Sequence, residues 1–499
     1  MPDSRLAGGD VDSRSSGWAI AGGIVFAAAF LNAFIFVLLY TNPIIVADDW
    51  YFLSVFLRPA LEGDLEFSDF YVYRGAGDHI QPLQKVILLL QLHWFDLDYS
   101  PSAVLGVFGA GASSLILVPI IWRESEENVP DRIKFFAWAL STAALFSMNT
   151  TGSWRWPLAS LNHLTSAISL VFIFFTWSEL RKGRSNRIGW AVIVFTLVVG
   201  DAAVLASSAI FVVLIFCCLG SFRSSKAIRL ALYFFLSLVA SQVLMSSLAP
   251  VVGETAEFST APDQMAHLFR IFLSEGWWKW WALPLSNSVI ATDRLEHLFG
   301  DKAALWQILI ALSLLTLHLL FWRRFIREPT NGASFFAAAL MLLFYGHVIG
   351  IILFRVSIFG TQYLEQPRYL LFYQFNLVAL MVMLAAYFRP PASLKLRGAQ
   401  SATFGFTLLC FFALQIEFSQ ASWATGIHLT AYYQKAARDI VDMEAYPGLT
   451  PKNCTTIIPL CDQSEERRIQ TIGLLRRFGL NVFSARFRRI HASVIHLHE

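Results

Sequence analysis

Long apolar stretches recur along this chain, and no other feature of the sequence constrains its fold as strongly. A helix needs about 20 apolar residues to cross the hydrocarbon core of a bilayer. Hydrophobic residues make up 56% of the 499 residues and charged residues only 15%, which is outside the usage of soluble proteins. The sequence therefore predicts an all-α polytopic membrane protein with about eleven transmembrane helices. The predicted spans are residues 18–41, 101–122, 134–150, 157–178, 187–200, 202–220, 228–249, 303–322, 334–355, 368–388 and 401–420.

Positive charge alternates between the two sets of loops that join these spans. One set is short and basic, with 16 Lys and Arg among 55 residues, whereas the opposite set holds 7 among 112. Lys and Arg in short loops stay on the cytoplasmic side, so the pattern places the polar N-terminal tail, residues 1–17, in the cytoplasm. An odd number of spans then puts the C-terminus outside. The net charge of +3 is too small to indicate a nucleic-acid-binding protein.

Three larger pieces of chain then lie on the outer face, because the cytoplasmic loops are all short. Two of them interrupt the transmembrane domain, residues 18–420, and the third follows it. Chemistry that needs more than a turn of polypeptide is therefore expected outside, at the membrane surface. The three pieces are the first outer loop, 42–81, the second large outer loop, 250–302, and the C-terminal domain, 421–499.

The C-terminal domain is polar, and its pattern predicts a small α+β region. We expect a helix near 425–444 and a short strand at 455–460. Cys454 and Cys461 also lie in this domain. An extracytoplasmic compartment permits disulfides, so these two cysteines either pair or remain free thiols.

Two adjacent aspartates, Asp48 and Asp49, lie where the first apolar run reaches water. An apolar stretch beginning at Trp50 follows at once and returns the pair to the membrane surface. Ionisable side chains in such positions are functional candidates, and partial removal from water brings a carboxylate toward the basicity that a general base needs. We therefore predict that Asp48 or Asp49 is catalytic. The alternative is that the pair only marks the end of the span.

A second polar cluster in the first outer loop consists of Asp78 and His79, shortly before Pro82 and a further apolar run. The histidine could contact an acceptor, a phosphate or a metal, although a single interfacial histidine is often structural. Two aspartates and a histidine can hold a divalent cation, so metal dependence stays open. We predict Asp78 and His79 to be substrate contacts.

Arg368 and Tyr369 lie at the outer entrance of the tenth predicted span. Arginine binds phosphate through a planar fork that is always charged, so we predict this pair to bind a phosphate of the substrate. Arg355 is a second cation of the same kind. The alternative is that Arg368 snorkels to the interface or pairs with Glu365 as an ordinary residue at the end of a span.

Arg155 lies on the same outer face, between Trp154 and Trp156. Indole rings and a guanidinium suit a sugar ring, and we predict Arg155 to be a further substrate contact. Trp and Arg are also common at membrane interfaces, which is the alternative explanation.

The arrangement resembles the GT-C superfamily of integral-membrane glycosyltransferases, which includes the protein O-mannosyltransferases and the aminoarabinose transferases of lipid A. The segment Asp48-Asp49-Trp50-Tyr51 occupies the position of that family's acidic motif, just after the first span, and the layout is similar over nearly the whole chain. The resemblance implies that a first-loop aspartate acts as base on the acceptor while a sugar departs from a polyprenyl phosphate. The segments at His79 and at Arg368-Tyr369 also look like stretches of that family.

Several absences agree with this resemblance. The sequence has no Gly-rich phosphate loop between strand and helix, no H-E-x-x-H and no G-x-S-x-G. No polar part is large enough for a nucleotide-sugar domain, so no nucleotide cofactor is expected and a lipid-linked donor fits better. We predict a bacterial inner-membrane enzyme with a periplasmic C-terminus. Its partners are a polyprenyl-phosphate sugar donor, a glycan, lipid or protein acceptor, and membrane lipids.

Two other functions stay open. An O-antigen-type polymerase or ligase would depend mainly on arginines and histidines in later outer loops, above all in 250–302. A lipid or solute transporter (flippase) would need ionisable residues near the middle of the membrane, and the apolar runs contain very few of them. The sugar, the acceptor and the oligomeric state do not follow from the sequence.

Overall fold

The computed structural model describes residues 10–73, 79–149, 151–219, 225–249, 261–389, 394–446, 458–461 and 464–492, and in these ranges it contains helices but no β-strand. Eight of the described helices are long and apolar enough to cross a membrane. The prediction of an all-α polytopic membrane protein is therefore confirmed.

Each of the eleven predicted runs contains a helix, although three of these helices, α6, α9 and α10, are shorter or less apolar than the eight. The eleven are α1 (Asp10–Tyr40), α5 (Ser100–Arg123), α6 (Asp131–Leu145), α8 (Pro157–Arg181), α9 (Ser185–Val199), α10 (Asp201–Leu219), α11 (Ser225–Leu248), α15 (Ala303–Arg327), α16 (Gly332–Ile351), α18 (Leu370–Tyr387) and α19 (Leu394–Ala445).

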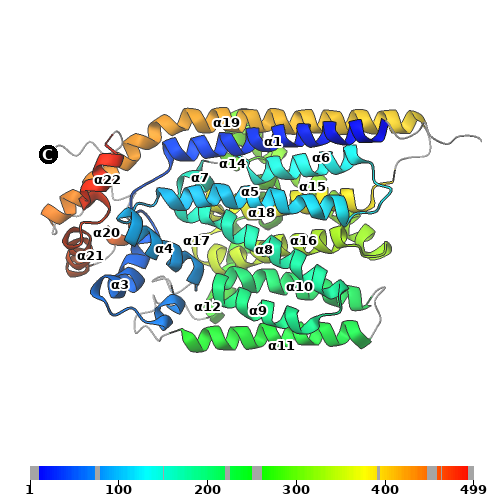
Figure 1. The fold of residues 1–499 in the computed structure, drawn as a ribbon. Coiled ribbons are helices and arrows are strands. Elements are labelled where there is room, and N and C mark those ends of the chain that lie inside the picture. The colour runs from blue at the N-terminus through cyan, green and yellow to red at the C-terminus, as the bar shows by residue number, and fades with distance from the viewer. Residues whose placement is uncertain are drawn as a thin grey trace, which may run out of the picture.

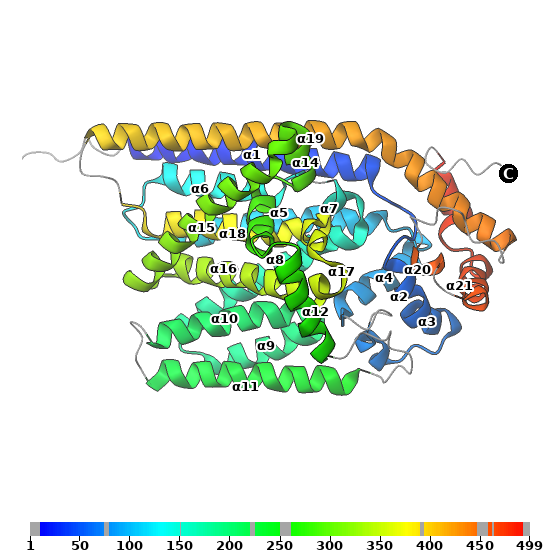
Figure 2. The ribbon, with the colours of Figure 1, turned by 180° about the vertical axis from the view of Figure 1, so that it is seen from behind.

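These helices run side by side as a bundle, with α1 and α19 along one edge and α11 along the opposite edge (Figures 1 and 2). Small residues allow neighbouring helices of the bundle to approach each other most closely. Gly106 of α5 lies against α8 so tightly that a Cβ there would come within 2.0 Å of the Ser160 hydroxyl oxygen. Such small-residue contacts hold membrane helices together because lipid offers no hydrophobic drive for their association.

Helix α19 joins the last predicted span to the C-terminal domain without a break. Its 52 residues include both the span 401–420 and the helix near 425–444 that the sequence predicts separately. At about 1.5 Å per residue the helix is far longer than a bilayer is thick. It therefore reaches past the end of α1 toward the C-terminal segments (Figure 1).

Within the described residues of the C-terminal domain, every regular element is a helix or a helical turn. The predicted strand at 455–460 is wrong for residues 458–460, which begin the short helix α20 (Ile458–Cys461), while 455–457 lie outside the described residues. A proline at 459 removes a backbone donor, which disfavours a ladder. Cys461 is disulfide-bonded, and Cys454 lies outside the described residues.

The first outer loop and the C-terminal domain pack together as one cap at one end of the bundle (Figure 1). Trp50 from the loop and Leu475 and Val482 from the domain belong to one buried cluster. Asn481 links the two, because its amide donates to the carbonyl oxygens of Pro43 at 3.0 Å and Leu97 at 2.7 Å. The cap comprises α2 (Asp49–Phe52), a π-helical turn (Leu53–Leu57), α3 (Arg58–Glu62), a 3₁₀ turn (Phe67–Tyr71), α4 (Pro82–Phe95), α20, α21 (Glu465–Arg477), a 3₁₀ turn (Asn481–Phe483) and α22 (Ala485–Ile490).

The described part of the second large outer loop, residues 261–302, folds into three helices and a 3₁₀ turn. Trp277 is exposed between the first two, whereas Trp278, Trp280 and Trp281 pack against the main core. These helices are α12 (Ala261–Ser274), α13 (Lys279–Val289) and α14 (Thr292–Phe299), followed by a 3₁₀ turn (Gly300–Lys302). Short elements complete the same end of the bundle: α7 (Gly152–Arg155), a π-helical turn (Ile352–Val356), α17 (Ser357–Phe359) and 3₁₀ turns at Thr361–Glu365 and Pro367–Tyr369.

Candidate functional site

Asp48 and Arg368 form an ion pair between the first outer loop and the entrance of α18. The Arg368 Nη1 lies 3.3 Å from the Asp48 Oδ2, and about a fifth of each side chain is exposed. Asp48 immediately precedes α2, and Arg368 lies in the 3₁₀ turn before α18. The sequence separates these residues by more than 300 positions, so only the fold brings them together.

Three aromatic rings surround the Arg368 guanidinium. Its central carbon lies 5.5 Å from the ring of Trp156, 5.2 Å from that of Tyr363 and 5.3 Å from that of Tyr369. The guanidinium also donates to the Tyr363 hydroxyl. Cation–π contacts of this kind favour a desolvated arginine, so the rings fix the fork at the end of α18. Tyr369, a predicted contact, belongs to this ring cage.

Asp48 and Asp49 differ sharply in their surroundings. Ala47 takes a left-handed conformation, with φ of 48°, and turns the chain between the apolar run and α2. Asp49 points inward and is fully buried, with its Oδ2 3.5 Å from the Val46 amide. Burial, with a smaller contribution from the Asp49 charge, raises the pKa of Tyr99 well above its usual value. Asp48 is therefore partly exposed, whereas Asp49 is fully buried.

His79 forms a second polar network with two residues from distant helices. Its Nδ1 lies 3.3 Å from the Asp201 Oδ2, and its Nε2 lies 3.3 Å from the Arg355 Nη2. A neutral imidazole with its proton on Nδ1 donates to the carboxylate and accepts from the guanidinium, so both contacts are satisfied. Asp201 also accepts from the Ile80 amide at 2.9 Å.

A glycine at the start of α10 makes this second network possible. Gly200 has φ of +78°, and a Cβ there would come within 2.0 Å of the Ile80 carbonyl oxygen. Only glycine allows both the conformation and the close approach. The corner between α9 and α10 thus lies directly against the loop that carries His79.

The two networks adjoin one another. The charge of Arg355 acts on both Arg368 and Tyr369. The Arg368 guanidinium, which lies among aromatic rings, and the Arg355 guanidinium, which contacts His79, are therefore close enough to interact. We refer to the residues Asp48, Arg368, Tyr363, Tyr369, Trp156, Arg355, His79 and Asp201 as the polar cluster.

Arg155, another predicted site residue, makes different contacts. The Arg155 guanidinium lies 5.5 Å from the ring of Tyr432 in α19, and its backbone oxygen accepts from the Asn42 amide at 2.9 Å. These contacts tie the start of the first outer loop to α19. Asp78 lies outside the described residues.

Neighbouring contacts hold the segments that carry the polar cluster. Thr361 donates to the Glu275 carboxylate from its amide at 2.8 Å and from its hydroxyl at 2.6 Å, and these bonds lower the pKa of Glu275.

The Lys85 ammonium is buried and donates to the carbonyls of Asp69 and Phe70, both at 3.0 Å. Burial lowers the pKa of Lys85 to about 7 against the raising effect of Asp69.

Asp201 and Tyr363 are residues of the polar cluster to which the sequence assigns no role. Asp201 is the clearest omission, because it follows Gly200 at a break between two apolar runs. An acid at such a break is itself a signal, since ionisable residues at membrane depth are rare without a function. The break at Gly200-Asp201 is therefore the sequence signal that could have identified Asp201 as the partner of His79.

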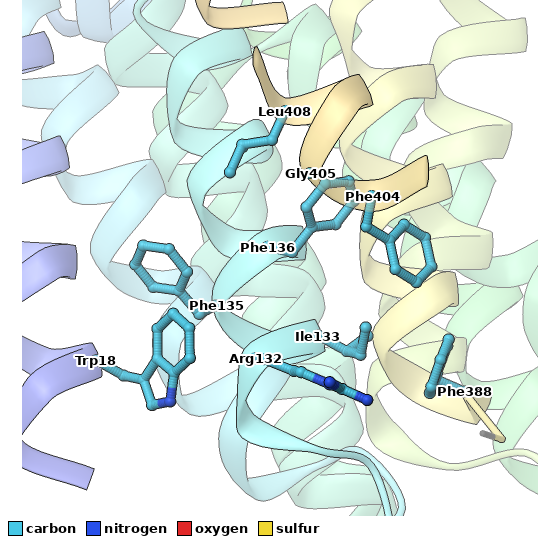
Figure 3. Close-up of a pocket in the computed structure, with 9 residues that line it drawn as sticks. All are labelled: Trp18, Arg132, Ile133, Phe135, Phe136, Phe388, Phe404, Gly405 and Leu408. Atoms are coloured by element: carbon cyan, nitrogen blue, oxygen red, sulfur yellow. The ribbon is translucent and has the colours of Figure 1, made fainter. Parts of the chain in front are cut away.

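An aromatic pocket of about 200 Å³, drawn in Figure 3, is lined by residues near the start of α1 and just after α18, whereas the polar cluster lies beyond the other ends of these helices. Its single charged side chain is Arg132, and none of its residues is a predicted site residue. Its lining is Trp18, Arg132, Ile133, Phe135, Phe136, Phe388, Phe404, Gly405 and Leu408. Within the described ranges, no group of three or more His, Cys, Asp and Glu side chains is placed to hold a metal ion.

Comparison with known proteins adds no family assignment. No protein-family model matches the chain, and no curated protein matches it. The geometry of the polar cluster is therefore the basis for inferring a function.

Proposed function

We propose that the protein is a GT-C-type membrane glycosyltransferase that moves a sugar from a polyprenyl-phosphate donor to a glycan, lipid or protein acceptor. The observation that carries the proposal is the partly exposed Asp48–Arg368 pair, with a second guanidinium beside it. The Asp48 carboxylate can serve as a base, and the Arg368 guanidinium beside it can bind a phosphate, so one site offers both groups. These are the two groups that transfer from a sugar phosphate requires.

Asp48 accepts the proton of an acceptor hydroxyl, whose oxygen forms a bond to the anomeric carbon of the sugar. The bond from that carbon to the phosphate oxygen breaks, and polyprenyl phosphate leaves with the electron pair. The phosphate gains negative charge as it leaves, so cations aimed at it stabilise the transition state more than the ground state. Arg368 has this role, and Arg355 assists it.

A lipid-linked donor suits the position of the polar cluster. The cluster lies at an end of α18, where the phosphate of a lipid meets the membrane surface while its chain stays among the exposed apolar helix faces. We further propose eleven spans, a bacterial inner membrane, a cytoplasmic N-terminus and a periplasmic C-terminus. The disulfide at Cys461 supports an oxidising compartment for the C-terminal domain.

A transport function has less support. A transporter gathers its ionisable groups near the middle of the membrane, whereas Arg368 and Asp48 lie at the ends of α18 and α1. An O-antigen-type polymerase or ligase would need essential residues in the second large outer loop. There, Glu275 contacts Thr361 rather than the polar cluster.

Asp48→Asn tests the proposal. The full chain is reconstituted in vesicles and supplied with a panel of polyprenyl-phosphate-linked sugars and a membrane extract as the source of acceptors, and release of polyprenyl phosphate is measured. We expect the variant to lose about 10²- to 10⁴-fold in transfer rate, the usual effect of removing a general base.

Glu62→Gln is the matched control, because Glu62 is a carboxylate of the same loop that pairs with Arg58 away from the polar cluster. It should transfer at the wild-type rate. Full activity in Asp48→Asn would exclude Asp48 as the base. The absence of transfer from every donor by the wild-type protein would exclude the proposed function.

A further inference from the structure

The aromatic pocket is a cavity between helices that the proposed transfer reaction does not use. Its walls come from α1, α6, the end of α18 and α19 (Figure 3). Its volume is about 200 Å³, and an apolar cavity of about 150 Å³ stays dry and holds a molecule the size of benzene. The pocket therefore has room for several apolar carbon atoms and favours them over water.

The aromatic rings of the lining pack against one another and fix the shape of the pocket. Ring centroids lie 5.1 Å apart for Trp18 and Phe135, 5.0 Å for Phe136 and Phe404, and 5.8 Å for Phe388 and Phe404. These separations fall in the range of roughly 4.5–7 Å at which aromatic pairs attract. Because the rings of different helices support one another, the pocket is formed before any ligand enters it.

Arg132 is the one charged side chain of the lining, and it is exposed. Other arginines at this end of the bundle have glutamate partners, as in the pairs Arg181–Glu124 and Arg389–Glu328. Among the described residues, by contrast, no hydrogen bond or ion pair of the Arg132 guanidinium is seen. This guanidinium can therefore attract an anion from outside the chain.

The position of the pocket along the helices indicates which anion that is. Trp18 lies just before the apolar stretch Ile20–Tyr40, and Phe388 directly follows the apolar stretch Pro367–Tyr387. The pocket thus lies where membrane spans end, at the level where lipid chains meet their phosphates. Basic pockets between transmembrane helices bind the headgroups of anionic lipids.

We propose that the aromatic pocket binds an anionic phospholipid, with part of an acyl chain among the rings and the headgroup phosphate at Arg132. The lipid would join α1, α6, α18 and α19 where they meet. It is not a reactant in the proposed transfer, so this inference does not depend on that function and can fail or hold separately from it.

Phosphatidylglycerol with brominated acyl chains is the probe, because bromine quenches only the tryptophans that lie close to it. The full chain is purified in detergent and titrated with this lipid. The difference in quenching between the wild type and Trp18→Phe reports on Trp18 alone. We expect Trp18 to be quenched saturably, at about fivefold lower concentrations than with brominated phosphatidylcholine, which is the effect of one arginine near an anionic headgroup.

Two variants and their matched controls separate the headgroup from the chain. Arg132→Gln should raise the half-quenching concentration of phosphatidylglycerol about fivefold, whereas Arg123→Gln, at an exposed arginine outside the lining, should leave it unchanged. Gly405→Leu fills the pocket and should abolish saturable quenching of Trp18. Gly23→Leu should not, although a Cβ at either glycine meets no atom within 4 Å, because Gly23 is not part of the lining.

Equal quenching curves for Arg132→Gln and Arg123→Gln, or for the two brominated lipids on the wild type, would overturn the assignment of the phosphate to Arg132. Saturable quenching that persists in Gly405→Leu would overturn the pocket as the site of the chain. Thermal unfolding verifies that each variant is folded. Leu408→Phe, which also fills the pocket, takes the place of Gly405→Leu if that variant does not fold.

Discussion

The polar cluster and the aromatic pocket lie at opposite ends of the same two helices, α1 and α18, and they are built differently. The cluster joins Asp48, Arg368, His79 and Asp201 from four separate parts of the chain. The pocket is lined almost wholly by apolar side chains, with Arg132 as its one charged residue (Figure 3). The first can bind a charged reactant in a defined orientation, and the second offers only shape and apolar surface.

This difference shows where chemistry is built into a bundle that is otherwise apolar. Buried or half-buried charges are costly unless they are paired. In the polar cluster, Asp48 pairs with Arg368 and Asp201 pairs with His79. The aromatic pocket carries no such cost. Substitutions at the two ends are therefore expected to differ strongly in their effect on the reaction.

The largest effect is expected for Arg368→Lys. Lysine keeps the charge but loses the planar fork and its stacking on Trp156, Tyr363 and Tyr369. We expect the transfer rate in reconstituted vesicles to fall by about 10²- to 10³-fold, which is the typical cost of losing a charged donor in a transition state. A rate near that of the wild type would show that a positive charge alone is sufficient and that the ring cage has no role.

The sequence predicts the bundle well because membrane helices follow from local composition. The eleven apolar runs all contain helices, and runs such as that of α18 need no tertiary information. Residues 458–460, part of the predicted strand, are helical instead, because Pro459 disfavours a ladder and Leu460 is buried in the cap as part of α20. Local propensity is least reliable in such short polar segments.

The candidate site could be predicted only in part. Asp48, His79 and Arg368 are each conspicuous, since a charged side chain at the end of an apolar run is unusual. Their pairing is not local: Asp201 meets His79 only because Gly200 permits the approach, and Asp48 differs from Asp49 only through the turn at Ala47. Neither fact can be read from spacing along the chain.

An intermediate effect is expected for Asn481→Ala, which tests whether the C-terminal domain supports the polar cluster. The change leaves the buried carbonyl of Leu97 without the Asn481 donor, at a cost of about 1–3 kcal/mol, whereas the Pro43 carbonyl keeps its bond from the Tyr99 amide. Hydrogen exchange should rise in the segment from Ile44 to Ala47, which leads to Asp48, and stay unchanged around Phe136 in the aromatic pocket. Equal protection in wild type and variant would show that α1 alone holds this segment.

The smallest effect is expected for Arg132→Gln, which removes one exposed guanidinium at the aromatic pocket. It matches Arg368→Lys in altering an arginine at an end of the bundle, but Arg132 lines the aromatic pocket at the other end of α18 from Arg368. Substitutions at exposed positions usually change stability by no more than about 0.5 kcal/mol, so transfer should stay within about twofold of the wild-type rate in the same vesicle assay. A loss as large as that expected for Arg368→Lys would mean that both ends take part in the reaction, and the division between a reactive end and an inert end would have to be abandoned.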